Sequence, residues 1–277
     1  MKELWMRFPD GRRKALTLSY DDGVEQDIRL IEIMNRHGLK GTFNLSSGLY
    51  AADGQAWPKG QVHRRLSRKA ALEMYAGCGQ EIAVHALYHG DLPHLPPAHA
   101  LWQVLRDREQ LENDFGRIIR GMAYPYGTVS DELAKALEGC GMAYARTVES
   151  THRFDIPTDW LKLPATCHHD DPQLMQLAQT FVSEQSQRPW LFYLWGHSYE
   201  FEAHDNWQII EAFAALTGGR NDVWYASNIE ICDYVKAWRG MHASADGRRL
   251  HNASCMKLWL EADGRPHCIA SGETLVL

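Results

Sequence analysis

Short apolar runs alternate with amphipathic stretches over the first 240 of the chain's 277 residues. The runs have the length of buried strands, and most intervening stretches carry apolar residues every three or four positions, which is typical of helices. Repeated strand–helix units predict a parallel sheet, either open or closed into a barrel, and seven or eight units favour the barrel. The active site of a barrel lies at the carboxyl ends of its strands. The predicted strands are 15–20, 42–45, 81–85, 121–125, 144–147, 161–165, 191–195 and 223–226.

The pattern changes near residue 240, where the helical signals stop after Gly240. We expect a barrel domain over residues 1–240 and a small β appendage over residues 245–277, with a hairpin turn at Ala262–Arg265. About thirty residues are too few to fold alone, so the appendage should pack on the barrel or on a partner, held by Trp259. We expect it to be structural, since the candidate catalytic groups precede it.

The charge and the cysteines exclude several classes of protein. The net charge of −6 and the pI near 6.1 give no electrostatic reason to bind nucleic acid or an anionic membrane. None of the six cysteines forms a Cys-x-x-Cys pair, so we expect free thiols. The first residues contain no apolar stretch of signal-peptide length, and the longest apolar run, Trp190–Trp195, cannot span a bilayer. We therefore expect a cytoplasmic protein.

Two adjacent carboxylates, Asp21 and Asp22, end the first predicted strand before Gly23. Neighbouring side chains at a strand end point in different directions, so one can bind a cation while the other remains free as a base. A solvated turn is the alternative interpretation, because Asp-Asp-Gly is common in loops.

Two histidines are four residues apart: His85 ends the third predicted strand, and His89 lies just beyond it. Together with one of the two aspartates they form a plausible set of zinc ligands that leaves positions open for water and substrate. Surface or capping histidines are the alternative for the pair alone.

Two further strand ends carry candidate groups. Pro125 and Gly127 flank Tyr126 in a tight turn that can direct a backbone N–H at an oxyanion. His197 follows the strand that ends at Trp195, and a histidine there is a candidate general acid. An ordinary turn and a rim histidine are the respective alternatives.

Taken together, these strand ends resemble the polysaccharide deacetylases, the NodB-homology family of carbohydrate esterases. The family's first motif, Thr-Phe-Asp-Asp-Gly, is similar to residues 19–23, and the His-x-x-x-His of its second motif matches His85 and His89. Residues 124–127 resemble the end of the third motif, Asp159-Trp160 the fourth, and Leu194 with His197 the fifth.

The resemblance implies a distorted (β/α)7-type barrel and one divalent metal ion, usually Zn²⁺, with Co²⁺, Ni²⁺ or Mn²⁺ as alternatives. Asp22, His85 and His89 would bind the metal, Asp21 would be the general base and His197 the general acid. The N–H of Tyr126 would help to stabilise the oxyanion. The implied reaction removes an acetyl group from an N- or O-acetylated sugar or oligosaccharide.

One departure from the family concerns the base. Ala123 stands where the family has an arginine that orients it, and we expect Arg146, on the following strand, to supply this charge. Tyr124, Trp195 and Glu200 are further candidates for substrate contacts. The run 167–171, Cys-His-His-Asp-Asp, looks metal-like, and we interpret it as a loop at the rim of the site.

Two alternatives remain open at this stage. One is an amidase on a non-sugar substrate, similar to an allantoinase or formamidase, and the other is a catalytically inactive carbohydrate-binding barrel. Retention of both Asp21 and His197 argues against the inactive barrel, because binding alone needs neither. The sequence leaves the acyl group, the native metal and homo-oligomerisation undecided.

Overall fold

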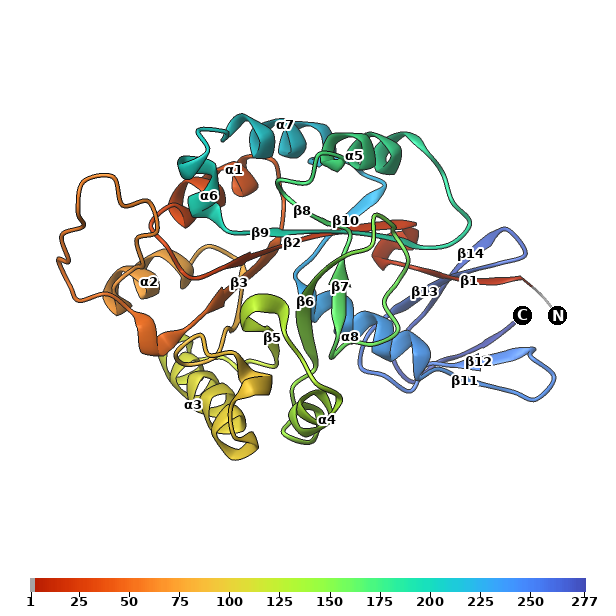
Figure 1. The fold of residues 1–277 in the computed structure, drawn as a ribbon. Helices are drawn as coiled ribbons and strands as arrows, with labels where there is room; N and C mark the ends of the chain where they lie inside the picture. The colour runs from red at the N-terminus through yellow and green to blue at the C-terminus, as the bar shows by residue number, and fades with distance from the viewer. Residues whose placement is uncertain (1–2) are drawn as a thin grey trace.

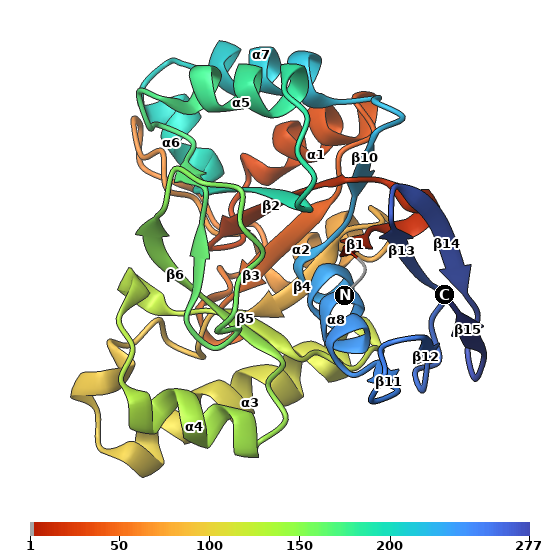
Figure 2. The same ribbon diagram turned by 90° about the vertical axis from the view of Figure 1, so that its right-hand side faces the viewer.

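The computed structural model describes residues 3–277 (Figures 1 and 2). Within these residues, nine strands form a central sheet of spatial order β7-β6-β5-β4-β3-β2-β9-β8, with β10 beside β2. Every pairing in this sheet is parallel, which confirms the predicted strand–helix architecture. The strands are β2 (Lys14–Asp21), β3 (Gly41–Leu45), β4 (Glu81–Val84), β5 (Gly121–Ala123), β6 (Tyr144–Ser150), β7 (Leu163–Ala165), β8 (Cys167–His168), β9 (Trp190–Gly196) and β10 (Val223–Tyr225).

The two ends of the sheet are neighbours in the chain. Only Thr166 separates β7, which pairs with β6, from β8, which pairs with β9. The sheet therefore curls until its ends meet at this segment, although no pairing of described residues joins β7 to β8 directly. This arrangement is the distorted, barrel-like α/β fold that the resemblance implied.

Helices flank the curled sheet on two sides. In both views α1, α5, α6 and α7 lie together on one side, and α3 and α4 lie on the opposite side (Figures 1 and 2). No helix in residues 3–277 combines the length and the apolar character needed to cross a membrane. The helices are α1 (Asp27–Arg36), α2 (Arg68–Tyr75), α3 (Pro97–Phe115), α4 (Asp131–Gly139), α5 (Leu174–Ser183), α6 (Ser198–Ala203), α7 (Gln208–Thr217) and α8 (Asn228–Arg239), with short 3-10 turns at Pro9–Gly11, Ser47–Leu49, Leu92–His94 and Pro125–Gly127.

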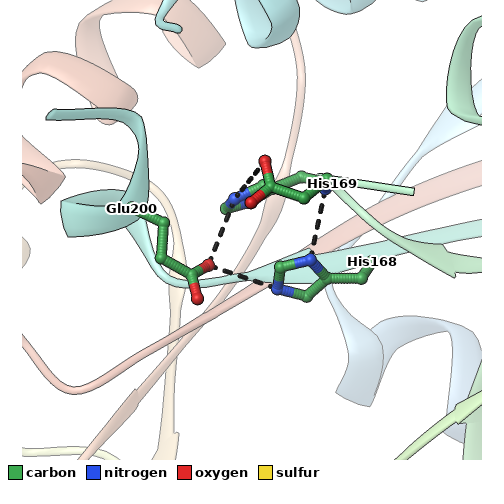
Figure 3. A group of neighbouring side chains, drawn as sticks. His168, His169 and Glu200 are labelled. Atoms are coloured by element: carbon green, nitrogen blue, oxygen red, sulfur yellow. Dashed lines mark hydrogen bonds and ion pairs between the residues drawn. The ribbon is translucent and has the colours of Figure 1, made fainter. Parts of the chain in front are cut away.

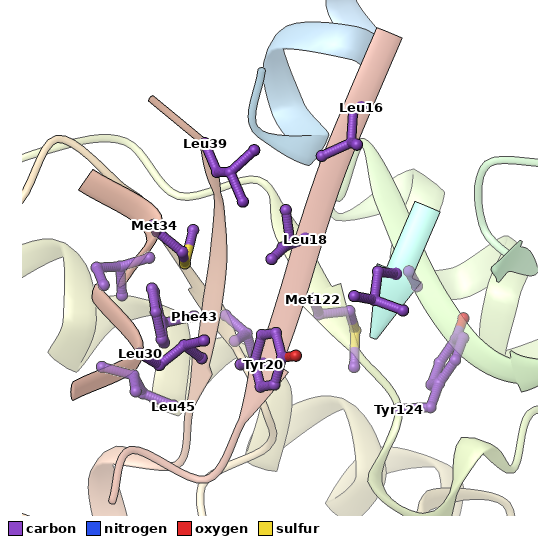
Figure 4. Close-up of a cluster of buried hydrophobic side chains, with 14 of the residues drawn as sticks. Leu16, Leu18, Tyr20, Leu30, Met34, Leu39, Phe43, Leu45, Met122 and Tyr124 are labelled. Carbon is purple, nitrogen blue, oxygen red and sulfur yellow. The ribbon is translucent and has the colours of Figure 1, made fainter. Parts of the chain in front are cut away.

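The strand β2 separates the main apolar core from a polar interior. Its alternate residues Leu16, Leu18 and Tyr20 are buried in one cluster with Leu30 and Met34 of α1 (Figure 4). Because side chains alternate across a strand, the intervening residues point to the opposite face. That face belongs to the inside of the curled sheet and ends in Asp21.

Hydrogen bonds satisfy the polar groups of this interior face. Thr17 Oγ1 donates to Asn228 Oδ1 over 2.9 Å, and Ser19 Oγ accepts from Asn44 Nδ2 over 2.9 Å. Buried polar groups need such partners, because an unpaired one costs about 1–3 kcal/mol. Thr17, Ser19 and Asp21 therefore form a row of polar side chains on the inner face of β2.

The helix α8 covers the amino-terminal edge of the sheet. The backbone N–H of Ile229 donates to Glu81 at the start of β4, and Lys236 Nζ donates to the carbonyl of Ala143 just before β6. The carboxyl ends of the parallel strands lie at the opposite edge, where the candidate residues gather.

The C-terminal segment forms two small antiparallel sheets, and one includes the amino-terminal strand. That strand, β1 (Leu4–Arg7), pairs with β13 (Leu258–Ala262), so it joins the appendage although the sequence placed residues 1–240 in the barrel. Leu258 and Leu260 are fully buried, whereas Trp259, the expected anchor, is half-buried. The remaining strands are β11 (His242–Ala243), β12 (Arg249–His251), β14 (Arg265–Ile269) and β15 (Thr274–Val276).

Candidate active site

Neighbouring strands bring the predicted residues to one edge of the sheet. Asp21 is the last residue of β2, His85 follows β4 directly, and His197 follows β9. Because β2 pairs with both β3 and β9, and β4 pairs with β3, these strand ends are adjacent. The structure thus brings together groups that are up to 176 residues apart, counted from Asp21 to His197.

Backbone strain is concentrated at this edge. Asp22, His89 and Tyr126 all have positive φ values, of 83°, 52° and 60°, as does Ala86 at 60°. Non-glycine residues rarely adopt this conformation, and where they do the strain often marks a functional site.

Asp22, His85 and His89 form a group suited to a divalent cation. One ligand atom from each lies within 4.8 Å of the others. His85 is buried, its Nδ1 lies 2.9 Å from the carbonyl of Ala123, and its Nε2 has no hydrogen-bond partner among the described residues. The carbonyl can only accept, so Nδ1 carries the proton and Nε2 presents a free lone pair, as in histidines that bind metals.

Burial keeps both imidazoles in the neutral form that metals require. It lowers the pKa of His85, against the opposing charges of Asp21 and Asp22. Burial and the neighbouring His85 lower the pKa of His89 to about 4. Neutral imidazoles bind a cation without first releasing a proton.

Asp22 also has two partners that the sequence did not reveal. Arg65 Nη2 lies 2.7 Å from Asp22 Oδ1, and His63 Nε2 lies 3.1 Å from Oδ2. The segment that carries them is held by an isolated bridge between Val24 and Arg65. The run His63-Arg64-Arg65 has no spacing that relates it to Asp22, so only the fold could identify these contacts.

Asp21 is buried against Arg146 and Asn44. Arg146 Nη2 contacts Asp21 Oδ2 in a short ion pair, and Asn44 Nδ2 donates to Oδ1 over 2.8 Å. Burial by itself would raise the pKa of Asp21, but the charge of Arg146, aided by His85 and His197, lowers it below the usual value. The carboxylate is therefore held ionised.

The register of two strands explains why Arg146 reaches Asp21. Arg146 of β6 pairs with Ala123 of β5, and residues in register on parallel strands point to the same face of the sheet. Its guanidinium lies over the ring of Trp195, 4.3 Å from the ring centroid. Trp195 thus positions the arginine and is itself only 8% exposed, so little of its surface remains for a substrate.

His197 faces Asp21 with one ring nitrogen and Glu200 with the other. His197 Nε2 lies 3.9 Å from Asp21 Oδ2, and Nδ1 lies 3.2 Å from Glu200 Oε1. Burial opposes protonation of His197, but Glu200 and Asp21 together raise its pKa above the usual value. A histidine with a raised pKa beside a carboxylate can hold a proton for donation.

Glu200 is partly buried and lies among three imidazoles. Its Oε2 is 3.2 Å from both His168 Nε2 and His169 Nε2 (Figure 3). Burial would raise its pKa, but these contacts and His197 lower it well below the usual range. Glu200 therefore contacts the candidate acid His197 at Nδ1, the ring nitrogen that faces away from Asp21.

The other predicted residues differ in position. Tyr126 is 63% exposed, and its ring packs edge-on against His89 with 4.7 Å between centroids. Tyr124 is 1% exposed and its hydroxyl donates to the carbonyl of Leu161, so it belongs to the core and not to the site surface. Asp159 is exposed in a loop, where its carboxylate accepts from the backbone N–H of Leu161.

Fold and site together define a barrel-like α/β protein with two histidines and one carboxylate gathered beside a second, buried carboxylate. The sequence profile of the polysaccharide deacetylase family matches residues 9–145, which contain Asp21, Asp22, His85, His89 and Tyr126. This segment of the chain, residues 9–145, thus belongs to the polysaccharide deacetylase family, as the resemblance indicated. No curated protein sequence matches the chain.

Solved structures share the fold at low sequence identity. A protein of Mycobacterium smegmatis proposed to be a polysaccharide deacetylase is 18% identical, with a TM-score of 0.62 over 86% of this chain and 96% of that chain. A variant of the peptidoglycan deacetylase PdaC of Bacillus subtilis is 16% identical, with a TM-score of 0.51 over 82% of this chain and 93% of that chain.

Proposed function

We propose that the protein is a metal-dependent deacetylase that removes an acetyl group from an N- or O-acetylated sugar or oligosaccharide. The observation that carries this proposal is the position of Asp21. Its buried carboxylate lies 3.8 Å from His85 Nε2, in the group suited to a cation, and 3.9 Å from His197 Nε2. A base, a cation site and an acid therefore surround one small volume.

The donor set fits a divalent ion such as Zn²⁺, with Co²⁺, Ni²⁺ or Mn²⁺ as alternatives. The unpartnered Nε2 of buried His85 supports this assignment, since otherwise a buried polar atom is left unsatisfied. Asp22, His85 and His89 would hold the ion. A bound divalent ion polarises an acyl carbonyl and lowers the pKa of water towards 7.

Asp21 is the proposed general base. Arg146 and Asn44 each bond one of its oxygens, so the carboxylate is fixed in orientation and remains ionised. It accepts the proton of the attacking water. A positioned base of this kind contributes typically 10²–10⁴-fold to the rate.

His197 is the proposed general acid. Its Nδ1 faces Glu200, which leaves Nε2 to donate a proton to the departing nitrogen or oxygen of the sugar. The ring of Tyr126 packs against His89, and the backbone N–H of Tyr126, in its strained turn, is the proposed donor to the oxyanion. The chain thus supplies a proposed group for proton abstraction, for oxyanion stabilisation and for protonation of the leaving group.

A screen for acetate release tests the proposal. Metal-reconstituted protein is incubated with N-acetylated and O-acetylated mono- and oligosaccharides, with allantoin as a non-sugar amide. We expect acetate from at least one sugar class. Ring opening of allantoin without acetate would favour an amidase, and saturable binding of sugars without any turnover would favour an inactive binding barrel; either result would overturn the proposal.

A further inference from the structure

A second group of metal-ligating side chains lies behind His197. His168 and His169, at the end of β8, face Glu200 of α6 (Figure 3). Asp170 belongs to the same group. One ligand atom from each of the four residues lies within 4.8 Å of the others. We propose that His168, His169, Asp170 and Glu200 form a second site for a divalent transition-metal ion, separate from Asp22, His85 and His89.

The ring of His169 is held rigidly in this group. It packs against both Tyr20 and Phe201, with ring centroids 5.7 and 4.1 Å away. A Cβ added at Gly196 would lie 2.0 Å from His169 Nδ1, so only glycine leaves room for the ring. A site whose ligand is already oriented loses little entropy when a cation binds.

The ring nitrogens of His169 are unsatisfied. The side chain is completely buried, yet neither Nδ1 nor Nε2 makes a hydrogen bond of acceptable geometry to any residue in 3–277. Nε2 nevertheless lies 3.2 Å from Glu200 Oε2 and 3.5 Å from Asp170 Oδ1. A cation that accepts the Nε2 lone pair between these carboxylates would satisfy that buried atom.

The separations match the edges of a small coordination shell. Ligand atoms about 2.0–2.1 Å from a tetrahedral Zn²⁺ lie roughly 3.3–3.4 Å from one another. The contacts of Glu200 Oε2 with His168 and His169 are both 3.2 Å, and the contact of His169 with Asp170 is 3.5 Å. Three of the separations between ligand atoms therefore already fit a bound ion.

The donor types select the class of cation. Two imidazoles with two carboxylates suit Zn²⁺ and its first-row neighbours, whereas Mg²⁺ and Ca²⁺ prefer oxygen donors alone. Among the described residues, no arginine or lysine forms an ion pair with Asp170 or Glu200; their charged partners are histidines. Two negative charges therefore face the proposed ion.

His168 is the ligand that must rearrange. Its Nδ1 accepts a 3.2 Å hydrogen bond from the backbone N–H of Asp170. When Nε2 binds a cation, the ring proton resides on Nδ1, so this bond has to break. The cost is limited because His168 is partly exposed and this hydrogen bond is open to solvent.

The proposed site shares Glu200 with the candidate acid. Oε2 faces His168 and His169, while Oε1 lies 3.2 Å from His197 Nδ1. A cation on Oε2 would fix the carboxylate that orients His197. The second ion is thus a positioning element and not part of the reacting group.

Counting bound metal in five proteins tests the inference. Each is stripped with chelator, titrated with Zn²⁺, dialysed and measured by elemental analysis. We expect two equivalents in the wild type, one in His168→Gln, one in Asp22→Ala and none in the double variant. His94→Gln, a change at an exposed histidine outside both groups, should retain two equivalents.

The result that overturns the inference is an unchanged metal content in His168→Gln, or a single equivalent in the wild type that only Asp22→Ala removes. The latter leaves the proposed function intact. A single equivalent that only His168→Gln removes supports the second site while it contradicts the first. If circular dichroism shows that His168→Gln is unfolded, Asp170→Asn replaces it with the same expected count.

Discussion

The contact between Asp21 and Arg146 shows that a positive charge absent from β5 can be supplied by the adjacent strand β6. The sequence identified Arg146 as a candidate because Ala123 leaves the base without its expected arginine. The structure pairs Ala123 with Arg146 in register and places the guanidinium against Asp21. Such an ion pair requires that the two side chains point to the same face of the sheet, and the arginine can come from either of two adjacent strands.

Replacing the arginine should shift the pH dependence of turnover. Arg146 lowers the pKa of Asp21, so in Arg146→Ala that pKa rises and the base becomes protonated at a higher pH. We expect the acidic limb of the pH–rate profile to move to higher pH and turnover to slow at pH 7. Arg146→Lys should retain part of the wild-type profile, and adding Ala123→Arg to Arg146→Ala should restore part of it. If the acidic limb stays in place and only KM rises, Arg146 is a substrate contact.

Removing one ligand of the first metal group should lower its occupancy. Asp22→Ala deletes the only carboxylate of the group, so we expect it to lose one equivalent of divalent metal by elemental analysis. Asp159→Ala removes an exposed carboxylate in a loop and is the matched control, with unchanged metal content. Full occupancy in Asp22→Ala would reject the assignment of this ligand.

At the scale of elements, the strand ends were predictable and many of their partners were not. Buried strands are continuous apolar runs, so the positions of Asp21, His85 and His197 at strand ends follow from the sequence alone. Arg65 and Asn44 reach the site through loop packing and neighbouring strands, which no local pattern encodes. The core position of Tyr124 was missed for the same reason.

The antiparallel pairing of β1 with β13 was also missed. Trp5 pairs with Glu261 across almost the whole chain, and the run 4–7 is too short to carry a clear strand signal. The expectation that Trp259 holds the appendage also differs from the structure, because Leu258 and Leu260 point into the structure while Trp259 lies between them on the other face.

The appendage should contribute to stability and not to turnover. Leu258 is fully buried and belongs to the cluster that contains Ile231 and Val235 of α8, so Leu258→Ala should cost about 2–5 kcal/mol of unfolding free energy. Trp259→Ala, at a half-buried neighbour, should cost less. Chemical denaturation measures both, with acetate release per folded molecule unchanged. Lost substrate binding at unchanged stability would place the segment in the active site.

At the scale of the whole molecule, one carboxyl group joins several elements. Glu81, at the start of β4, accepts hydrogen bonds from Thr42 of β3, Tyr144 of β6 and the backbone N–H of Ile229 in α8. Burial outweighs these contacts and raises its pKa to about 7. The protonation of Glu81 is therefore linked to the stability of the curled sheet and of the helix that covers its edge.

This linkage predicts a pH-dependent stability. The folded state binds the proton of Glu81 more tightly than the unfolded state, whose pKa is near 4.5. The stabilisation is complete below that value and is lost as the pH rises through about 7, up to about 3 kcal/mol in all. Urea denaturation at pH 5 and pH 8 should show a larger difference for the wild type than for Glu81→Gln. Equal differences in the two proteins would show that Glu81 does not titrate as proposed.

The central claim is that Asp21 is the base of a hydrolytic site and not a ligand of its metal. The most direct test is the rate of acetate release by metal-loaded Asp21→Asn on the best sugar substrate, with metal content measured on the same sample. The account predicts wild-type metal content and a rate lower by about 10²–10⁴-fold, because asparagine cannot take up the proton. Turnover near the wild-type rate at full metal occupancy would contradict it.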